Sequence, residues 1–185
     1  MMFMRKAGVD PKDVTFVGLN SADPATLLTA LDSGDFDAVI LWEPTSTLAR
    51  ERGTGFPIID IRDDATHTQY VGGESASEVL FVTEDFIKEK PEVIRAAVAA
   101  LDKSMTFIRE NSAEAVAAAT AKYYNMDADQ LARILGPIKD NYPVDGKISR
   151  AGMEIAIDIP RQGGLLKKEV TFDDLVDPQF AGVRD

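Results

Sequence analysis

The sequence contains no cysteine and a single histidine, His67, among its 185 residues. Without cysteine, this polypeptide has no disulfide, no thiolate nucleophile, no iron–sulfur ligand and no lipoprotein anchor, and its redox compartment is not recorded in it. A zinc site would have to be built mostly from carboxylates, because His67 lies in "DDATHTQY" with no second histidine nearby. We therefore predict no metal site and no cofactor, and we interpret His67 as a solvated loop residue.

Positive charge and long apolar runs are also scarce. Lys and Arg together number 20 against 31 Asp and Glu, and the formal net charge is -11. Such a field opposes a groove that follows phosphates, so we expect no nucleic-acid partner. No apolar run approaches the ~20 residues that span a bilayer. The opening "MMFMRKAGVD" becomes polar too soon for a signal peptide, so we expect no export address in this chain.

Familiar catalytic motifs are missing as well. The chain has no G-x-G-x-x-G, no Walker loop, no G-x-S-x-G and no Cys-His pair. Glu43 with Asp63 or Asp64 is the one carboxylate pairing worth considering, but nothing in the spacing sets their separation. Acids beside a helix start more often cap free N–H groups. We predict no catalytic residues and a protein that is not an enzyme.

What is present is a hydrophobic content of 45%, ample for a core, and an alternation of strand and helix signals. Apolar runs at 14–20, 37–42 and 56–61 predict strands. Between them lie two predicted helices, one with Asp23 as cap, Pro24 in its first turn and Gly34 as exit, the other running from Pro44 to Gly53. This β-α-β-α-β order predicts an α/β fold with a parallel sheet.

After Arg62 the amino-acid composition of the sequence changes. Residues 63–77 are polar and hold two adjacent glycines, which indicates a connector, and 78–86 predicts one more strand with a cap at Thr83. The rest is chiefly helical, and the helix at 91–111 carries a one-sided apolar stripe that is typical of core packing. The members of this stripe are Ile94, Val98, Leu101, Met105 and Ile108. We expect the tail to lie against the body through Val170, Phe172, Leu175 and Phe180.

The end of the second predicted strand, "DFDAVILWEP", is the best indication of a binding site. Ligands of α/β folds bind at the carboxyl ends of parallel strands. There Trp42 would present an aromatic face, Glu43 would cap the helix that Pro44 begins, and first-turn N–H groups and hydroxyls beside Thr45 would hold an anionic head. The alternative interpretation is that Trp42 only fills the core.

Several stretches together resemble a known family, the periplasmic solute-binding proteins of ABC importers for nitrate, sulfonates, taurine and thiamine-precursor-like solutes. "AGVDPKDVTFVGLNSADPATLLTALDSGDFDAVILWEPTSTLARERG" resembles the second lobe of that family, where a strand ends in W-E-P. "EVLFVTEDFIKEKPEVIRAAVAALDKSMTFIRENSAEAV" resembles the return to the first lobe, and "GLLKKEVTFDDLVDPQF" the closing tail. The order and spacing of the three stretches carry the resemblance.

The resemblance implies a type II periplasmic-binding-protein-like fold, with a parallel β-α-β lobe and a mainly helical part of the other lobe. It divides the chain into a second-lobe segment at 1–62, a hinge at 63–77 and a first-lobe part at 78–185. The implied function is capture of a small anionic or aromatic solute, of sulfonate, nitrate or pyrimidine type, between two lobes for transfer to an ABC permease. The implied ligand-binding residues are Trp42, Glu43, Thr45, Tyr70, Gly73 and Ser75.

Two alternatives stay open beside this interpretation. One is an enzyme on the same scaffold, such as a desulfinase or a thiamine-pyrimidine synthase, although relatives of that kind rely on cysteine or histidine-rich sites. The other is a truncated oligomeric remnant, because the sequence matches the family only from partway along a helix of the second lobe. The resemblance places the protein in the periplasm or otherwise outside the cytoplasm. With the apolar stripe of 91–111 uncovered, we expect a homodimer or a higher oligomer.

Overall fold

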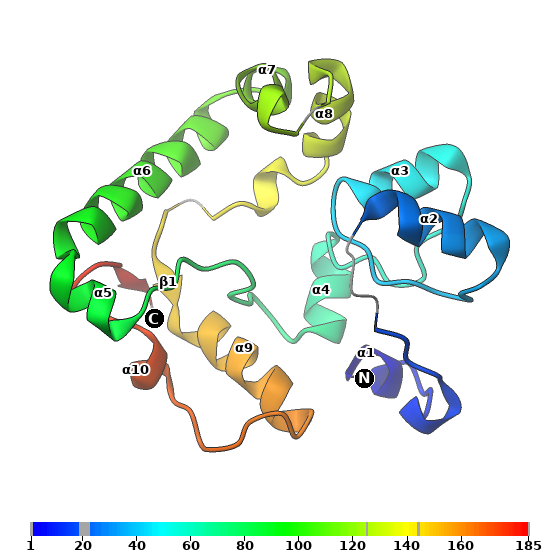
Figure 1. Ribbon diagram of the computed structural model, residues 1–185, viewed down its shortest axis with the longest axis horizontal. Helices are drawn as coiled ribbons and strands as arrows, with labels where there is room; N and C mark the ends of the chain where they lie inside the picture. The colour runs from blue at the N-terminus through cyan, green and yellow to red at the C-terminus, as the bar shows by residue number, and fades with distance from the viewer. Residues whose placement is uncertain (1, 19–22, 125, 144, 185) are drawn as a thin grey trace.

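Helices dominate the computed structural model, which describes residues 2–18, 23–124, 126–143 and 145–184 (Figure 1). Its α-helices are α1 Met2–Lys6, α2 Pro24–Ser33, α3 Thr45–Arg52, α4 Asp64–Tyr70, α5 Glu84–Glu89, α6 Pro91–Glu110, α7 Ala113–Tyr124, α8 Ala128–Leu135, α9 Arg150–Gln162 and α10 Phe172–Leu175. Two 3-10 turns, η1 Pro11–Asp13 and η2 Lys139–Asn141, and two short strands, β1 Ile148–Ser149 and β2 Val183–Arg184, complete the described elements.

The predicted helix boundaries of α2 and α3 are confirmed. The Asp23 carboxylate accepts a hydrogen bond from the backbone N–H of Thr26 at 3.1 Å, and Pro24 occupies the first helical position. Both helices end on glycines in the left-handed region, Gly34 at φ 75° and Gly53 at φ 71°. Only glycine adopts this conformation without steric cost, so these residues end the helices where the sequence indicates.

The predicted strands at 37–42, 56–61 and 78–86 are wrong as strands in this chain. Of the prediction at 14–20, residues 14–18 are likewise not a strand, and residues 19 and 20 lie outside the described residues. Within the described part of the chain, no backbone hydrogen bond outside a helix reaches 15–18, 37–41, 55–59 or 78–82. A segment becomes a strand only when a neighbour satisfies its backbone groups, and among the described residues these segments have no such neighbour.

The one ladder in the described residues is small and parallel. β1 pairs with β2 in the register Ile148 to Val183 and Ser149 to Arg184. The fold is therefore mostly helical α/β with a small parallel sheet, which is compatible with a periplasmic-binding-protein-like fold.

Two apolar clusters hold the C-terminal half together. In the first, Met153 and Ile157 of α9 pack against Phe172 and Val176 at α10. In the second, Ala117 and Ala121 of α7 pack against Leu131 of α8, and these small residues let the two helices approach closely. The tail thus contacts the body through a short helix that the sequence did not indicate, and Leu175, expected to pack there, is exposed.

The stripe of α6 is covered only in part. Ile94 is buried, Val98, Met105 and Ile108 are half-buried, and Leu101 is exposed. Figure 1 shows α5 to α8 following one another along one side of the molecule and α1 to α4 gathered on the other, with the extended stretch after α4 running between them. Residues 63–77 join these two groups, and they contain the helix α4.

Candidate functional site

Glu43 organises the first turn of α3. Its carboxylate accepts hydrogen bonds from the Ser46 hydroxyl at 3.1 Å, the Thr47 hydroxyl at 3.1 Å and the Thr47 backbone N–H at 3.2 Å. The prediction that Glu43 caps the helix after Pro44 is therefore confirmed. A carboxylate here satisfies donors that the helix itself leaves free and is favoured by the positive end of the helix dipole.

Arg62 joins this cap to a second carboxylate. Its guanidinium donates to Glu43 through Nη1 and to Asp60 through Nε at 2.7 Å. Arg50 of α3 donates to the other Asp60 oxygen at 3.0 Å. The side-chain hydrogen bond from Arg62 holds the pKa of Asp60 well below its usual range, and the bond to Asp60 raises the pKa of Arg62. Two guanidiniums and two carboxylates thus form a balanced network at the start and along the side of α3.

This network changes the chemistry expected for the site. The hydroxyls of Ser46 and Thr47 and the Thr47 N–H, which were predicted to hold an anionic head, already donate to Glu43. The Thr45 side chain is buried. Trp42, the residue before Glu43, is 71% exposed to solvent. The interpretation of Trp42 as a core filler is therefore wrong for this structure, because an indole that exposed packs little of its surface.

The predicted connector residues lie at the end of α4 and just after it. Tyr70 ends α4, and its ring meets Phe3 edge-to-face at a centroid distance of 6.1 Å. Gly73 lies at φ 149°, where only glycine is unstrained, and Ser75 is half-buried. Among the described residues, no hydrogen bond, ion pair or ring contact joins Tyr70, Gly73 or Ser75 to Trp42, Glu43 or Thr45. Within the described ranges, these contacts therefore do not link the six predicted residues into one site.

His67 lies within α4, not in a loop, and it is half-buried. The sequence interpretation failed here because Asp63 caps the segment, accepting from the Thr66 N–H at 2.8 Å, and so starts a helix in a polar stretch. Within the described ranges, no group of three or more His, Cys, Asp or Glu side chains gathers where a metal ion could bind.

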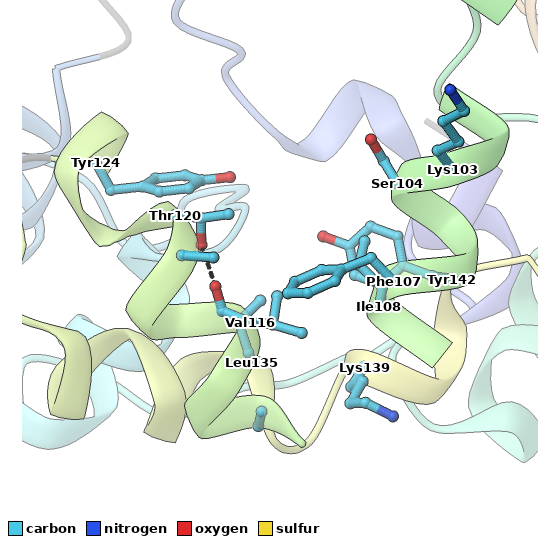
Figure 2. Close-up of a pocket in the computed structure, with 12 residues that line it drawn as sticks. Lys103, Ser104, Phe107, Ile108, Val116, Thr120, Tyr124, Leu135, Lys139 and Tyr142 are labelled. Carbon is cyan, nitrogen blue, oxygen red and sulfur yellow. Dashed lines mark hydrogen bonds between the residues drawn. The ribbon is translucent and has the colours of Figure 1, made fainter. Parts of the chain in front are cut away.

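A hollow that the sequence did not indicate lies between α6, α7 and η2 (Figure 2). Its volume is about 320 Å³. Phe107 of α6, Tyr124 of α7 and Tyr142 reach toward it, and Figure 2 shows both phenol hydroxyls directed into the space. Burial raises the pKa of Tyr142, and Tyr124 and Glu78 add to that effect. These residues come from distant parts of the chain without shared spacing, so no local pattern could have pointed to them.

Comparison with known proteins identifies one family. A family model described as NMT1/THI5 like matches residues 2–115, which include Trp42, Glu43 and the whole connector. No protein of curated function matches the chain, and no solved structure matches it.

Proposed function

Because the chain belongs to the NMT1/THI5 like family, we propose that it acts as the solute-binding component of an ABC importer. That family covers ABC solute-binding proteins and thiamine pyrimidine synthase, and its members are typically extracytoplasmic. No helix in the part of the chain that the structure describes is long and apolar enough to cross a bilayer. In the proposed role the protein captures a small solute between two lobes of type II arrangement and passes it to the permease.

The two lobes of this proposal follow the sequence interpretation. Residues 1–62 contribute to the second lobe, 63–77 form the hinge, and 78–185 belong to the first lobe. The positive φ of Gly72 and Gly73, at 110° and 149°, supports a backbone turn within the hinge. We place Tyr70, Gly73 and Ser75 on the hinge side of the solute, and Trp42, Glu43 and Thr45 on the second-lobe side.

The exposed indole of Trp42 is the observation that carries the proposal. The Glu43, Arg62 and Asp60 network holds the backbone on the C-terminal side of Trp42 by several hydrogen bonds, so the ring stands on a well-anchored turn. A preorganised aromatic face binds planar or apolar ligand parts with little loss of conformational entropy. Since the helix N-terminus is occupied by Glu43, the arrangement favours the aromatic members of the solute class, aryl sulfonates and pyrimidines, over nitrate.

An enzyme on the same scaffold is the second possibility, because thiamine pyrimidine synthase belongs to the same family. The chain offers this chemistry no cysteine and one histidine. In the described residues His67 takes part in hydrogen bonds through its backbone, donating its N–H to Asp63 and accepting at its carbonyl from Val71 and Gly72. We therefore propose binding without turnover. Incubation with an aryl sulfinate, an ester or a phosphate ester should leave the substrate unchanged. Consumption above background that is lost in Glu43→Gln or His67→Gln would support the enzyme instead.

A calorimetric screen tests the binding proposal directly. The intact chain is titrated with an aryl sulfonate, taurine, nitrate and a hydroxymethylpyrimidine, and hits are checked by thermal shift, since a ligand of the folded state raises Tm. Trp42→Ala should weaken the binding of the tightest ligand by about 1–3 kcal/mol, because the indole face on which the ligand stacks is lost. Tyr123→Ala is the matched control, an aromatic that is 77% exposed on α7. Equal affinity in Trp42→Ala and parent would remove Trp42 from the site.

A further inference from the structure

The hollow between α6, α7 and η2 has the size and the lining of a small-molecule site. Its volume of about 320 Å³ lies at the lower end of the range for ligand pockets, roughly 300–1,000 Å³, which suits a ligand of one or two rings. Much of its wall is apolar, with Phe107 and Ile108 from α6, Val116 from α7 and Leu135 from α8. More than half of the lining residues lie beyond residue 115, where the family match ends, so family membership assigns the hollow no role.

The α7 side of the hollow is held in place by packing. Ala117 and Ala121 of α7 contact Leu131 of α8, and all three side chains are buried. Val116, which faces the hollow from the same helix, is only 5% exposed. A wall that is already in place binds a small ligand with little loss of conformational entropy.

Two phenol hydroxyls are the donors that the hollow leaves to a ligand. The hydroxyls of Ser104 and Thr120 already donate to carbonyls of their own helices, at 2.9 Å and 2.8 Å. The hydroxyls of Tyr124 and Tyr142 make no hydrogen bond to another described residue, and Figure 2 shows both directed into the hollow. Burial raises the pKa of Tyr142, so its hydroxyl keeps its proton at neutral pH and can donate it to an acceptor.

The charges of the lining are all positive. Lys103 of α6 and Lys139 of η2 line the hollow, and among the described residues no Asp or Glu belongs to the lining. The ion pair of Lys139 is long, at 3.8 Å, and its partner Asp140 has a side chain that is 97% exposed, so this pair holds the lysine weakly. The flexible stems of the two lysines let their ammonium groups turn toward a bound anion. In a chain of net charge -11, this is a local site that favours negative charge.

We propose that the hollow binds a small aromatic carboxylate, with its rings against Phe107 and Val116 and its carboxylate at the hydroxyls of Tyr124 and Tyr142. Two donors directed into one space suit the two oxygens of a carboxylate, and the bonds are strengthened by its charge. Aromatic rings pack well against the aromatic part of the wall. A polypeptide segment is the poorer occupant, because the lining offers few acceptors for its backbone N–H groups.

Titration calorimetry of the full chain with naphthoate and naphthamide tests the ligand class. Naphthoate should bind saturably with a Kd below about 1 mM. Naphthamide has the same rings but one acceptor oxygen and no charge, so it should bind at least about 10-fold more weakly. The absence of saturable naphthoate binding up to about 1 mM, or equal affinity for the two compounds, would overturn the proposal.

Conservative tyrosine variants test the polar contacts. Tyr124→Phe and Tyr142→Phe each remove one hydroxyl and should each weaken naphthoate about 10-fold. Tyr123→Phe is the matched control, because Tyr123 lies on the same helix as Tyr124, is 77% exposed and does not line the hollow. It should leave the affinity unchanged. Full affinity in both Tyr124→Phe and Tyr142→Phe would overturn the proposed contacts.

A pair of alanine variants tests the place of binding. Ala118 and Ala119 are both exposed on α7, but only Ala119 lines the hollow. Ala119→Phe should therefore weaken naphthoate at least about 10-fold by filling the space, whereas Ala118→Phe should not. Loss of binding in Trp42→Ala with full affinity in Tyr142→Phe would assign naphthoate to the Trp42 turn and overturn the proposal. The inference does not rest on the proposed function, since Trp42 is not part of this lining.

Discussion

The helix pairs of the C-terminal half and the segment from residue 37 to Arg62 are built from similarly apolar sequence, yet they bury it very differently. α7 with α8, and α9 with α10, enclose apolar side chains such as Ala117, Leu131 and Ile157. The segment at 37–62 leaves Ile40, Trp42 and other large apolar side chains exposed. A helix satisfies its own backbone and needs a neighbour only for one face, whereas a strand also needs neighbours along its edges.

The segment from residue 37 to Arg62 is held instead by hydrogen bonds between charged side chains. Arg50 and Arg62 bind Glu43 and Asp60, and these hydrogen bonds anchor the turn at Trp42 to the end of the next extended segment. Such partly exposed networks contribute less to stability than an apolar core of equal size. They do set local geometry, which a preorganised site requires. The comparison teaches that one region is stable by packing and the other is positioned by polar contacts.

The largest expected loss of stability follows from removing a buried aromatic ring from the helix pair α9 and α10. Phe172 is 3% exposed, lies among Met153, Ile157 and Val176, and stacks under the Arg150 guanidinium at 3.9 Å. Phe172→Ala should lower the free energy of unfolding by about 3–5 kcal/mol. Urea denaturation measures it, with Leu175→Ala on the exposed side of the same helix as control. A loss below about 1 kcal/mol would break the comparison, because it would mean that this cluster is not packed.

A smaller loss of stability is expected when Arg62, the cation that binds both Glu43 and Asp60, is removed. Arg62→Met leaves the Glu43 and Asp60 carboxylates without the guanidinium that joins them, and should lower the free energy of unfolding by about 1–3 kcal/mol. Lys88→Met, which removes an exposed pair with Asp85 at 3.7 Å, is the control and should change little. If Arg62→Met had the same free energy of unfolding as the parent, packing and not charge would hold residues 37–62.

The smallest effect is a pH dependence carried by Asp60. Its pKa is lowered in the folded state by the Arg62 hydrogen bond, so ionised Asp60 stabilises the fold above its unfolded pKa of about 3.9. This contribution is lost as the pH falls from about 5 through the folded pKa. Asp60→Asn should cost about 1 kcal/mol at pH 7, and the difference from the parent should shrink toward pH 3.

Denaturation curves at pH 7, 5, 4 and 3 measure this dependence. Asp140→Asn removes an exposed carboxylate and serves as the matched control. A gap between parent and Asp60→Asn that stays constant over the whole range would show that the amide disturbs the network by its shape, not by its charge. The result would then weaken the assignment of charge as the force that holds the second region.

The helices were largely predictable because their signals are local. Asp23 with Pro24 and Gly34, Thr83 before α5, and Ser149 before α9 are caps whose partners lie within a few residues. The strand predictions were less reliable. Val, Ile and Leu at 37–42 show only that a strand would be favoured if neighbouring strands were present. At the candidate site, the cap made by Glu43 was predictable from its place before Pro44. Its bond to Arg62, nineteen residues away, was not.

By itself, then, the sequence determined the positions of the caps, the apolar faces of the helices, the absence of thiol chemistry and the family, since each depends on residue identity at short spacing. Only the tertiary structure decided that the hydroxyls of α3 bind Glu43, that Trp42 faces solvent, and that Phe107, Tyr124 and Tyr142 line one hollow. It also decided that, in the part of the chain that the structure describes, the apolar segments at 38–41 and 79–82 make no backbone hydrogen bond to each other or to another segment. These outcomes depend on which distant surfaces meet, and packing between distant parts of a chain is not encoded in any one stretch of it.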